Sequence, residues 1–156
     1  MQQSATRPAY PAAGALAGLA GAILIDAYRL VTRVVIAQET GPSGFYQHVA
    51  SGLIGADAYR SADAVWLGVA AHLAISVAWA IGFAQVASRM PQVRARPVLS
   101  GAIFGIVVMI VMLLVELLAG IYVPLSANEA LNELIAHTLF FGIPIALIVA
   151  RRLRAA

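Results

Sequence analysis

The chain has 156 residues, of which 62% are hydrophobic and only 11% are charged, and its mean hydropathy is +0.88. Soluble domains are nearer half apolar, so this composition excludes a soluble globular protein and indicates a single integral membrane domain, residues 1–156. The lack of cysteine excludes disulfides, thiolate metal sites and cysteine nucleophiles. The net charge of +3 comes from arginines clustered beside apolar segments, which is typical of headgroup contacts with membrane lipids and not of nucleic-acid binding.

Four segments are long and apolar enough to cross a membrane, which takes roughly 20 residues in a helix. They lie at about 12–37, 64–88, 98–123 and 128–150, with breaks at Gly41-Pro42, Met90-Pro91 and Val123-Pro124. We therefore predict an all-α, four-helix transmembrane bundle. A cleaved signal peptide is the alternative for the first segment. Because its apolar run continues to Ala37 without a small-residue cleavage site, we favour retention.

The connection 38–63 is long and carries apolar residues at near-helical spacing, Phe45, Val49, Leu53 and Ile54. One interpretation is a short helix lying in the membrane interface. The other is an ordered loop over the mouth of the bundle.

Arginines are distributed unevenly between the two sides of the predicted bundle. One side carries Arg7, the arginines of the 89–97 loop and those of the C-terminus, while the other carries Arg29, Arg33 and Arg60. The positive-inside rule then predicts that both termini are cytoplasmic.

Spans one and three, and spans two and four, share features that suggest a two-helix internal duplication. Gly14 and Gly18 form a G-x-x-x-G motif in span one, and Gly101 and Gly105 form another in span three. Spans two and four share Ala-His, at His72 and His137, each followed seventeen residues later by an arginine. The alternative is chance, because G-x-x-x-G is a common motif for close helix packing, within one chain or between copies of it.

Ionisable residues inside predicted spans are costly in lipid and are therefore candidate functional residues. With both termini cytoplasmic, all of them fall in the outer half of the membrane, as one candidate polar cluster for solute or proton handling. The duplication register makes Arg29 and Glu116 equivalent and suggests an ion pair between them, and Asp26 lies one turn before Arg29. The structural alternative is an ion-pair network that only holds the helices together. The cluster consists of Asp26, Arg29, His72, Glu116, Glu133 and His137.

Span four begins with Glu133 and His137, which are four residues apart and share a helix face. We expect Glu133 near the helix start, where the helix dipole favours a carboxylate. Pro144 follows on roughly the same face and removes a backbone donor, so we predict a kink there.

His72 and His137 are predicted at one depth on two helices, which leaves three interpretations open. They form hydrogen bonds between helices, they handle protons, or they are the axial ligands of a haem b in a membrane redox protein. A metal site made by His72, His137 and Glu133 is a further alternative, although no recognisable ligand spacing supports it.

Several phrases in the chain carry a resemblance. They are HVASGLIGADAY, GVAAHLAISVAWA, YVPLSANE and AHTLFFGIPIAL, which together cover about residues 47–150. With them the chain resembles a group of small bacterial inner-membrane proteins with four predicted helices and no established activity. The resemblance implies a multi-pass inner-membrane bundle and carries over no catalytic residue. Arg60-Ser61 departs from its pattern, in which small residues are usual.

The sequence contains no Gly-rich phosphate loop, no G-x-S-x-G and no H-E-x-x-H, so we expect no catalysis. We expect either a small transport protein, acting on a solute or on protons, or an accessory subunit of a larger membrane complex. Because so small a bundle has little room for an internal pathway, transport favours a homo-oligomer.

Overall fold

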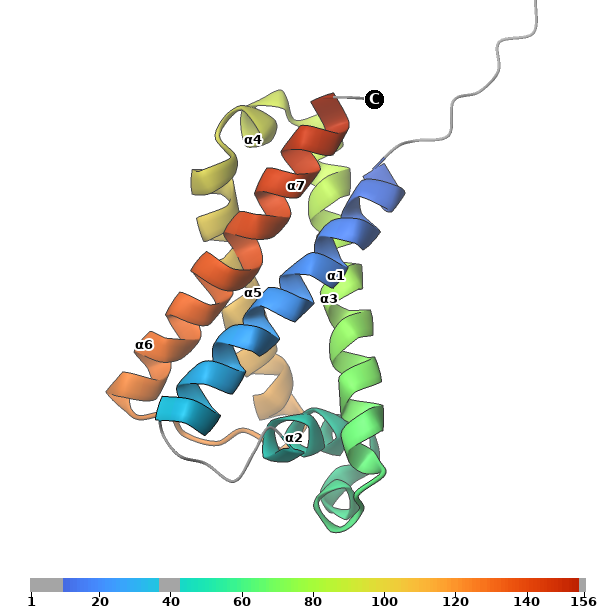
Figure 1. Cartoon of the computed structure of the whole chain (residues 1–156), viewed down its shortest axis with the longest axis vertical. Helices are drawn as coiled ribbons and strands as arrows, with labels where there is room; N and C mark the ends of the chain where they lie inside the picture. Colours follow the sequence, from blue (N-terminus) through green and yellow to red (C-terminus); the bar gives the residue numbers. More distant parts are fainter. Residues whose placement is uncertain (1–9, 37–42, 155–156) are drawn as a thin grey trace, which may run out of the picture.

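The computed structural model describes residues 10–36 and 43–154, and these form a bundle of four long helices (Figure 1). Span one is α1 (Tyr10–Arg29), which continues as the π-helix η1 (Leu30–Ile36). Span two is α3 (Ala64–Arg89), and span three is α5 (Pro97–Leu118). Span four runs through α6 (Ala127–Ile135), the π-helix η3 (Ala136–Gly142) and α7 (Ile143–Arg154).

All four long helices are apolar and long enough to cross a membrane, at Tyr10–Arg33, Ala64–Arg89, Pro97–Leu118 and Ala127–Arg154. No strand occurs in the described part of the chain. The prediction of an all-α, four-helix transmembrane bundle is therefore confirmed, and the chain is a multi-pass membrane protein. Arg7, Ala37 and the predicted break at Gly41-Pro42 lie outside the described residues.

Local sequence signals set the helix ends at the start of span four and the end of span three. Ser126 and Glu129 form a capping box, in which each side chain binds the other residue's backbone N–H, so span four begins at Ala127. Span three ends earlier than the predicted residue 123, at Leu118. The reason is Gly120, whose φ of 72° allows the Ile121 N–H to bind the Glu116 carbonyl and close the helix end.

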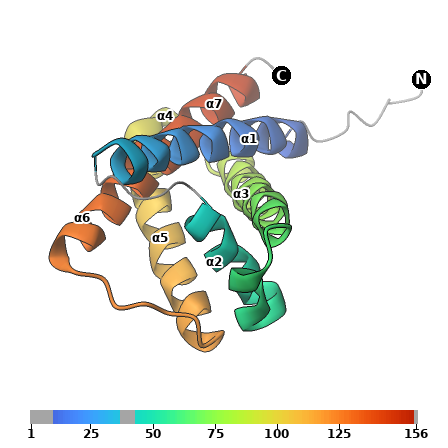
Figure 2. The ribbon, with the colours of Figure 1, turned by 60° about the horizontal axis from the view of Figure 1, so that its bottom comes forward.

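The connection between spans one and two contains a helix, α2 (Ser43–Ile54), followed by a 3₁₀ turn, η2 (Gly55–Arg60). This segment packs against α3 at the end of the bundle away from the start of α1 and the end of α7 (Figures 1 and 2). We call this end the α2 end. The close approach depends on Gly68, because a Cβ there would collide with the Tyr46 carbonyl. The short helix of the first interpretation is therefore present, and the alternative of a loop is wrong for residues 43–60. The position of this helix in the membrane interface stays a prediction.

The four helices associate as two antiparallel pairs that are built alike. In α1, Gly14 lies against Ala80 and Ile81, and Gly18 lies against Ser76 and Val77 of α3. In α5, Gly101 and Gly105 lie in the same way against η3 and the start of α7. In each pair a G-x-x-x-G motif brings one span close to the backbone of the next, which is the arrangement that a two-helix duplication predicts.

Pro144 lies in α7, directly after the π-helical turns of η3. The irregular, π-helical segment of span four therefore lies before the proline, and it contains His137. The predicted kink stays a prediction.

Candidate functional site: a histidine-lined cavity at the α2 end

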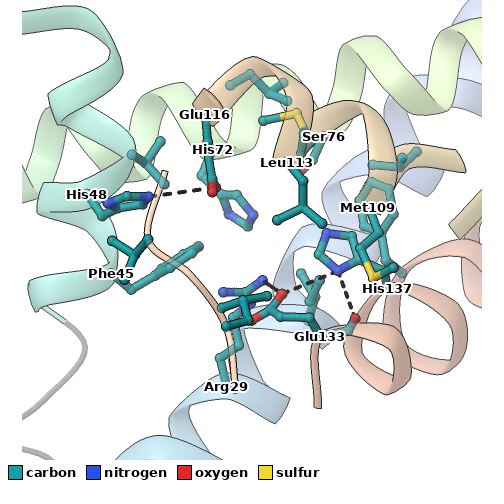
Figure 3. Close-up of a pocket in the computed structure, with 18 of the residues that line it drawn as sticks. Arg29, Phe45, His48, His72, Ser76, Met109, Leu113, Glu116, Glu133 and His137 are labelled. Atoms are coloured by element: carbon teal, nitrogen blue, oxygen red, sulfur yellow. Dashed lines mark hydrogen bonds and ion pairs between the residues drawn. The ribbon is translucent and has the colours of Figure 1, made fainter. Parts of the chain in front are cut away.

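A cavity of about 350 Å³ extends from the α2 end into the bundle between α3 and α5 (Figure 3). Residues of α1, η1, α2, η2, α6 and η3, with Val123 and Leu125 of the connection before α6, complete its wall. Its volume is at the lower end of the range for small-ligand pockets. The ionisable side chains on its wall are Arg29, Arg33, His48, Tyr59, His72, Glu116, Glu129, Glu133 and His137.

Arg29 and Glu133 form an ion pair at the site, with Arg29 Nη2 2.5 Å from Glu133 Oε2. Both side chains are largely buried, with exposed fractions of 12% and 16%. The guanidinium of Arg29 also lies over the Phe45 ring, 4.4 Å from its centroid. This pair fastens span one to span four, and the Phe45 contact ties α2 to both.

The predicted pair between Arg29 and Glu116 is wrong, because the structure pairs each of them with another residue. α1 packs against α3, η3 and α7, so the guanidinium on its last turn reaches span four. α5, which carries Glu116, packs against η3 and α7. Position along a helix predicts only the level of a charge in the bundle, whereas the order of the helices around the bundle selects its partner.

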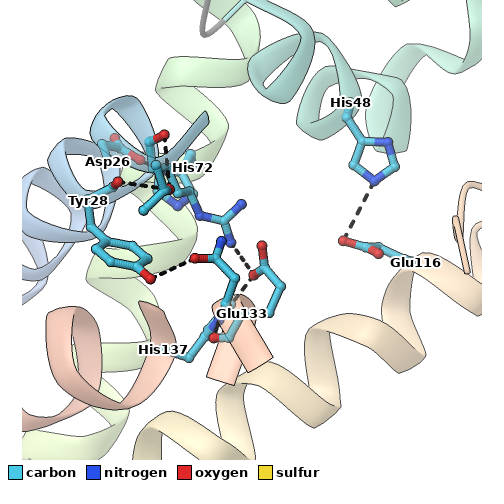
Figure 4. A network of polar contacts seen from close by, with 10 residues as sticks. Asp26, Tyr28, His48, His72, Glu116, Glu133 and His137 are labelled. Carbon is cyan, nitrogen blue, oxygen red and sulfur yellow. Dashed lines mark hydrogen bonds and ion pairs between the residues drawn. The ribbon is translucent and has the colours of Figure 1, made fainter. Parts of the chain in front are cut away.

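Every histidine of the chain faces a carboxylate beside this cavity (Figure 4). His72 Nδ1 lies 3.3 Å from Asp26 Oδ1, and His137 Nδ1 lies 3.4 Å from Glu133 Oε2. In the third pair, His48 Nε2 of α2 lies 3.7 Å from Glu116 Oε1 of α5. Imidazole and carboxylate are both groups that can hold a proton, so the three pairs are candidate sites for proton transfer.

The side chain of Asp26, on α1, lies near residues of both α3 and α2. Sequence spacing put it on the same face as Arg29, yet its neighbours are His72, with Nδ1 3.3 Å from Asp26 Oδ1, and the phenol of Tyr46, whose pKa it affects. Burial of the Tyr46 side chain and, after it, the charge and hydrogen bond of Asp26 raise the pKa of this phenol to about 12. Tyr46 is therefore a neutral donor at any physiological pH.

Glu133 and His137 share a helix face, as their spacing predicts, and His137 Nδ1 also lies 2.9 Å from the Glu133 carbonyl oxygen. Glu133 is not at the start of the helix, however. The capping box places Glu129 in the first turn and Glu133 in the second. The phrase SANE contains this S-x-x-E signal, which a search for apolar runs does not use.

His48 is a site residue that the sequence analysis missed. It lies outside the predicted spans, where an ionisable side chain has no desolvation cost. The search for ionisable residues within spans therefore did not select it. The available signal was its place in the near-helical pattern of the connection, between Phe45 and Val49. All three residues line the cavity.

The deep end of the cavity is closed by aromatic rings. Trp79 and Phe141 line the cavity and lie next to Phe104, with ring centroids 6.3 and 6.1 Å from it. Phe83 packs on Phe104 with its ring centroid at 4.7 Å. Beyond these rings the helices are joined by the contacts of Gly14 and Gly101. The cavity is therefore closed toward the end of the bundle where α1 begins and α7 ends.

The alternative of a metal bound by Glu133, His137 and His72 is not supported. Within residues 10–36 and 43–154, no three histidine or carboxylate side chains gather closely enough to hold a metal ion. The haem alternative stays a prediction. His72 and His137 both line the cavity with Nδ1 near a carboxylate, so Nε2 is the nitrogen through which they would hold a haem iron.

Comparisons with protein-family models, curated proteins and solved structures find no match to this chain. The function of the protein is therefore inferred from the geometry of the cavity.

Proposed function

We propose that this protein binds a small solute in the cavity at the α2 end and exchanges protons with it, as a transport protein of a bacterial inner membrane. One observation carries the proposal: all three histidines of the chain stand beside carboxylates next to a single cavity. A network that only held the helices together would need no cavity among these groups.

The orientation of the cavity follows from the arginines. Arg89, Arg94, Arg151, Arg152 and Arg154 lie at the end where α7 terminates, while the cavity is at the α2 end. The positive-inside rule places the arginine-rich end in the cytoplasm, with both termini. The cavity then faces the outer side, and the aromatic rings close it toward the cytoplasm. This is the geometry of an outward-facing binding state, from which transport requires the aromatic closure to open.

Thiol labelling tests whether the cavity is open to water on the outer side. The chain has no cysteine of its own, so single cysteines report without background. Met112→Cys places a thiol on the cavity wall. Ile110→Cys is the matched control on the same helix, because Ile110 is 48% exposed on the outside of the bundle, where lipid is expected.

We expect a charged, membrane-impermeant methanethiosulfonate added outside intact cells to label Met112→Cys and to leave Ile110→Cys unlabelled. Reagents of this class react with the hydrated thiolate, which does not form in lipid. Equal labelling of the two positions, or labelling of neither, would contradict an outward-open aqueous cavity.

Proton flux into proteoliposomes separates transport from an accessory role. The readout is luminal pH under an imposed potassium diffusion potential. A transport protein gives faster proton flux than protein-free vesicles, and His137→Ala or Glu116→Gln abolishes the difference while the helical circular dichroism is unchanged. An accessory subunit gives no flux and retains a stable partner through purification in mild detergent.

A further inference from the structure

Glu116 differs electrostatically from the other two carboxylates on the cavity wall. Glu133 binds Arg29, and Glu129 is close enough to Arg33 to interact with its charge. Glu116 instead faces an imidazole, with His48 Nε2 3.7 Å from Glu116 Oε1. The Glu116 side chain is 28% exposed, so a molecule in the cavity can reach it. The α5 wall therefore presents an anion that suits a cationic ligand.

The rest of the cavity wall near Glu116 is apolar and polarizable. Met112 and Met109 lie one and two turns deeper on α5, and Trp79 and Phe45 line the cavity from α3 and α2. Aromatic ring faces attract cations, and thioethers pack well against rings. Phe45 already contacts the guanidinium of Arg29 in this way, at 4.4 Å. The wall is thus suited to the apolar body of a molecule whose charged group faces Glu116.

We propose that the solute is a small organic monocation, with an ammonium-type head group at Glu116 and an apolar body against Trp79 and the two methionines. This inference rests on the proposed solute-binding function and names its substrate class. A molecule suits the site better than a metal ion, because the histidines and carboxylates of the described residues do not gather in groups of three. The cavity of about 350 Å³ limits the solute to a small molecule.

The intrinsic fluorescence of Trp79 reports binding directly. The chain has two tryptophans, and Trp66 is 74% exposed and away from the cavity wall, so Trp66→Phe leaves Trp79 as the reporter. This variant is placed in nanodiscs of zwitterionic phosphatidylcholine, which do not attract cations to the lipid surface. Three probes of matched shape are titrated: benzyltrimethylammonium, its neutral isostere neopentylbenzene, and the anion phenylmethanesulfonate.

We expect benzyltrimethylammonium to change the Trp79 fluorescence saturably and at lower concentration than the other two probes. Glu116→Gln should weaken its binding by ~10-fold or more, since it removes the charge that the head group faces. Glu116→Asp keeps that charge and should bind within a few-fold of the parent. Asp57→Asn should bind as the parent does, because its carboxylate is 82% exposed on η2 and does not line the cavity.

The remaining outcomes overturn the substrate class and are distinguishable from failure of the proposed function. Equal binding of the neutral isostere, or preference for the anion, refutes the cation and leaves a solute-binding cavity. Cation binding that survives Glu116→Gln unchanged refutes the role of Glu116. If no probe alters the fluorescence while Met112→Cys is labelled from outside, the cation is refuted and the open cavity stands. If Met112→Cys is also unlabelled, the proposed function fails with it.

Discussion

Arg29 and Glu133 illustrate how one buried pair can serve both stability and the site. Both side chains are largely buried, so each charge depends on the other for compensation. The pair joins the end of α1 to α6, and the neighbouring residue on each helix repeats that connection, through a hydrogen bond of 2.6 Å from the Tyr28 hydroxyl to Asn132 Oδ1. The same two residues form part of the cavity wall.

Glu133→Gln should lower the free energy of unfolding by about 2 kcal/mol, between the values typical of exposed and of fully buried pairs, because it leaves Arg29 uncompensated. The measurement is denaturant unfolding in mixed micelles. Asp57→Asn is the control, because it breaks the exposed pair with Arg60 and should change stability by less than about 1 kcal/mol. An equal decrease in the free energy of unfolding in the two variants would show that the Arg29–Glu133 pair stabilises the protein no more than the exposed pair does.

Tyr46 gives a pH-dependent prediction. Its pKa is raised from 10.0 to about 12 in the folded protein, so folding favours the neutral phenol. The stabilisation is complete below pH 10 and is lost as the pH rises from 10 toward about 12. In an alkaline titration followed by phenolate absorbance, Tyr46→Phe should remove a step near pH 12. Tyr122→Phe, which changes an exposed side chain, should leave that step in place.

At the scale of the helices, small residues decide how closely the spans approach. Gly105 lies on α5 against the backbone of His137 and Thr138, and a Cβ there would collide with both. Because η3 carries His137, the fit of Gly105 also positions an imidazole at the cavity. Close packing of α5 and η3 is therefore a condition for the site as well as for the bundle.

Gly105→Ala should destabilise the protein by about 1–3 kcal/mol, the usual cost of overpacking a tight contact. Gly82→Ala is the matched control, because a Cβ on Gly82 of α3 meets no atom within 4 Å. It should be neutral or stabilise by about 0.5–1 kcal/mol through the better helix propensity of alanine. Thermal unfolding in detergent compares the two, and equal midpoints would contradict the packing role of Gly105.

At the scale of the whole molecule, the sequence predicts where the helices lie along the chain better than it predicts which helices are in contact. Long apolar runs predicted four spans to within a few residues, except that the run through Ile121, Tyr122 and Val123 concealed the stop at Gly120. Residue spacing within one helix predicted correctly that Glu133 and His137 share a face. It could not show that span one meets span four, on which the partner of Arg29 depends. It also missed His48, because α2 gains its importance only when it folds over the cavity.

The repeated helix pairing implies that the chain can be divided. Each half, α1 with α3 and α5 with span four, is a hairpin closed by its own G-x-x-x-G contact, and the two halves are joined by α4 (Pro91–Ala95) at the arginine-rich end. If each hairpin inserts and packs by itself, two separate genes encoding residues 1–92 and 93–156 should produce fragments that associate in the membrane. Co-purification of an untagged fragment with its tagged complement measures this, with the Gly105→Ala second fragment as a weakened comparison. If the fragments neither associate nor bind the probe, the covalent link between the two halves is essential.

Complementation of the fragments would instead show that each hairpin is an independent unit. Such a unit is consistent with an ancestor made of two identical two-helix chains. In that ancestor α2 would be absent, and its later addition would have made the two halves of the cavity unequal.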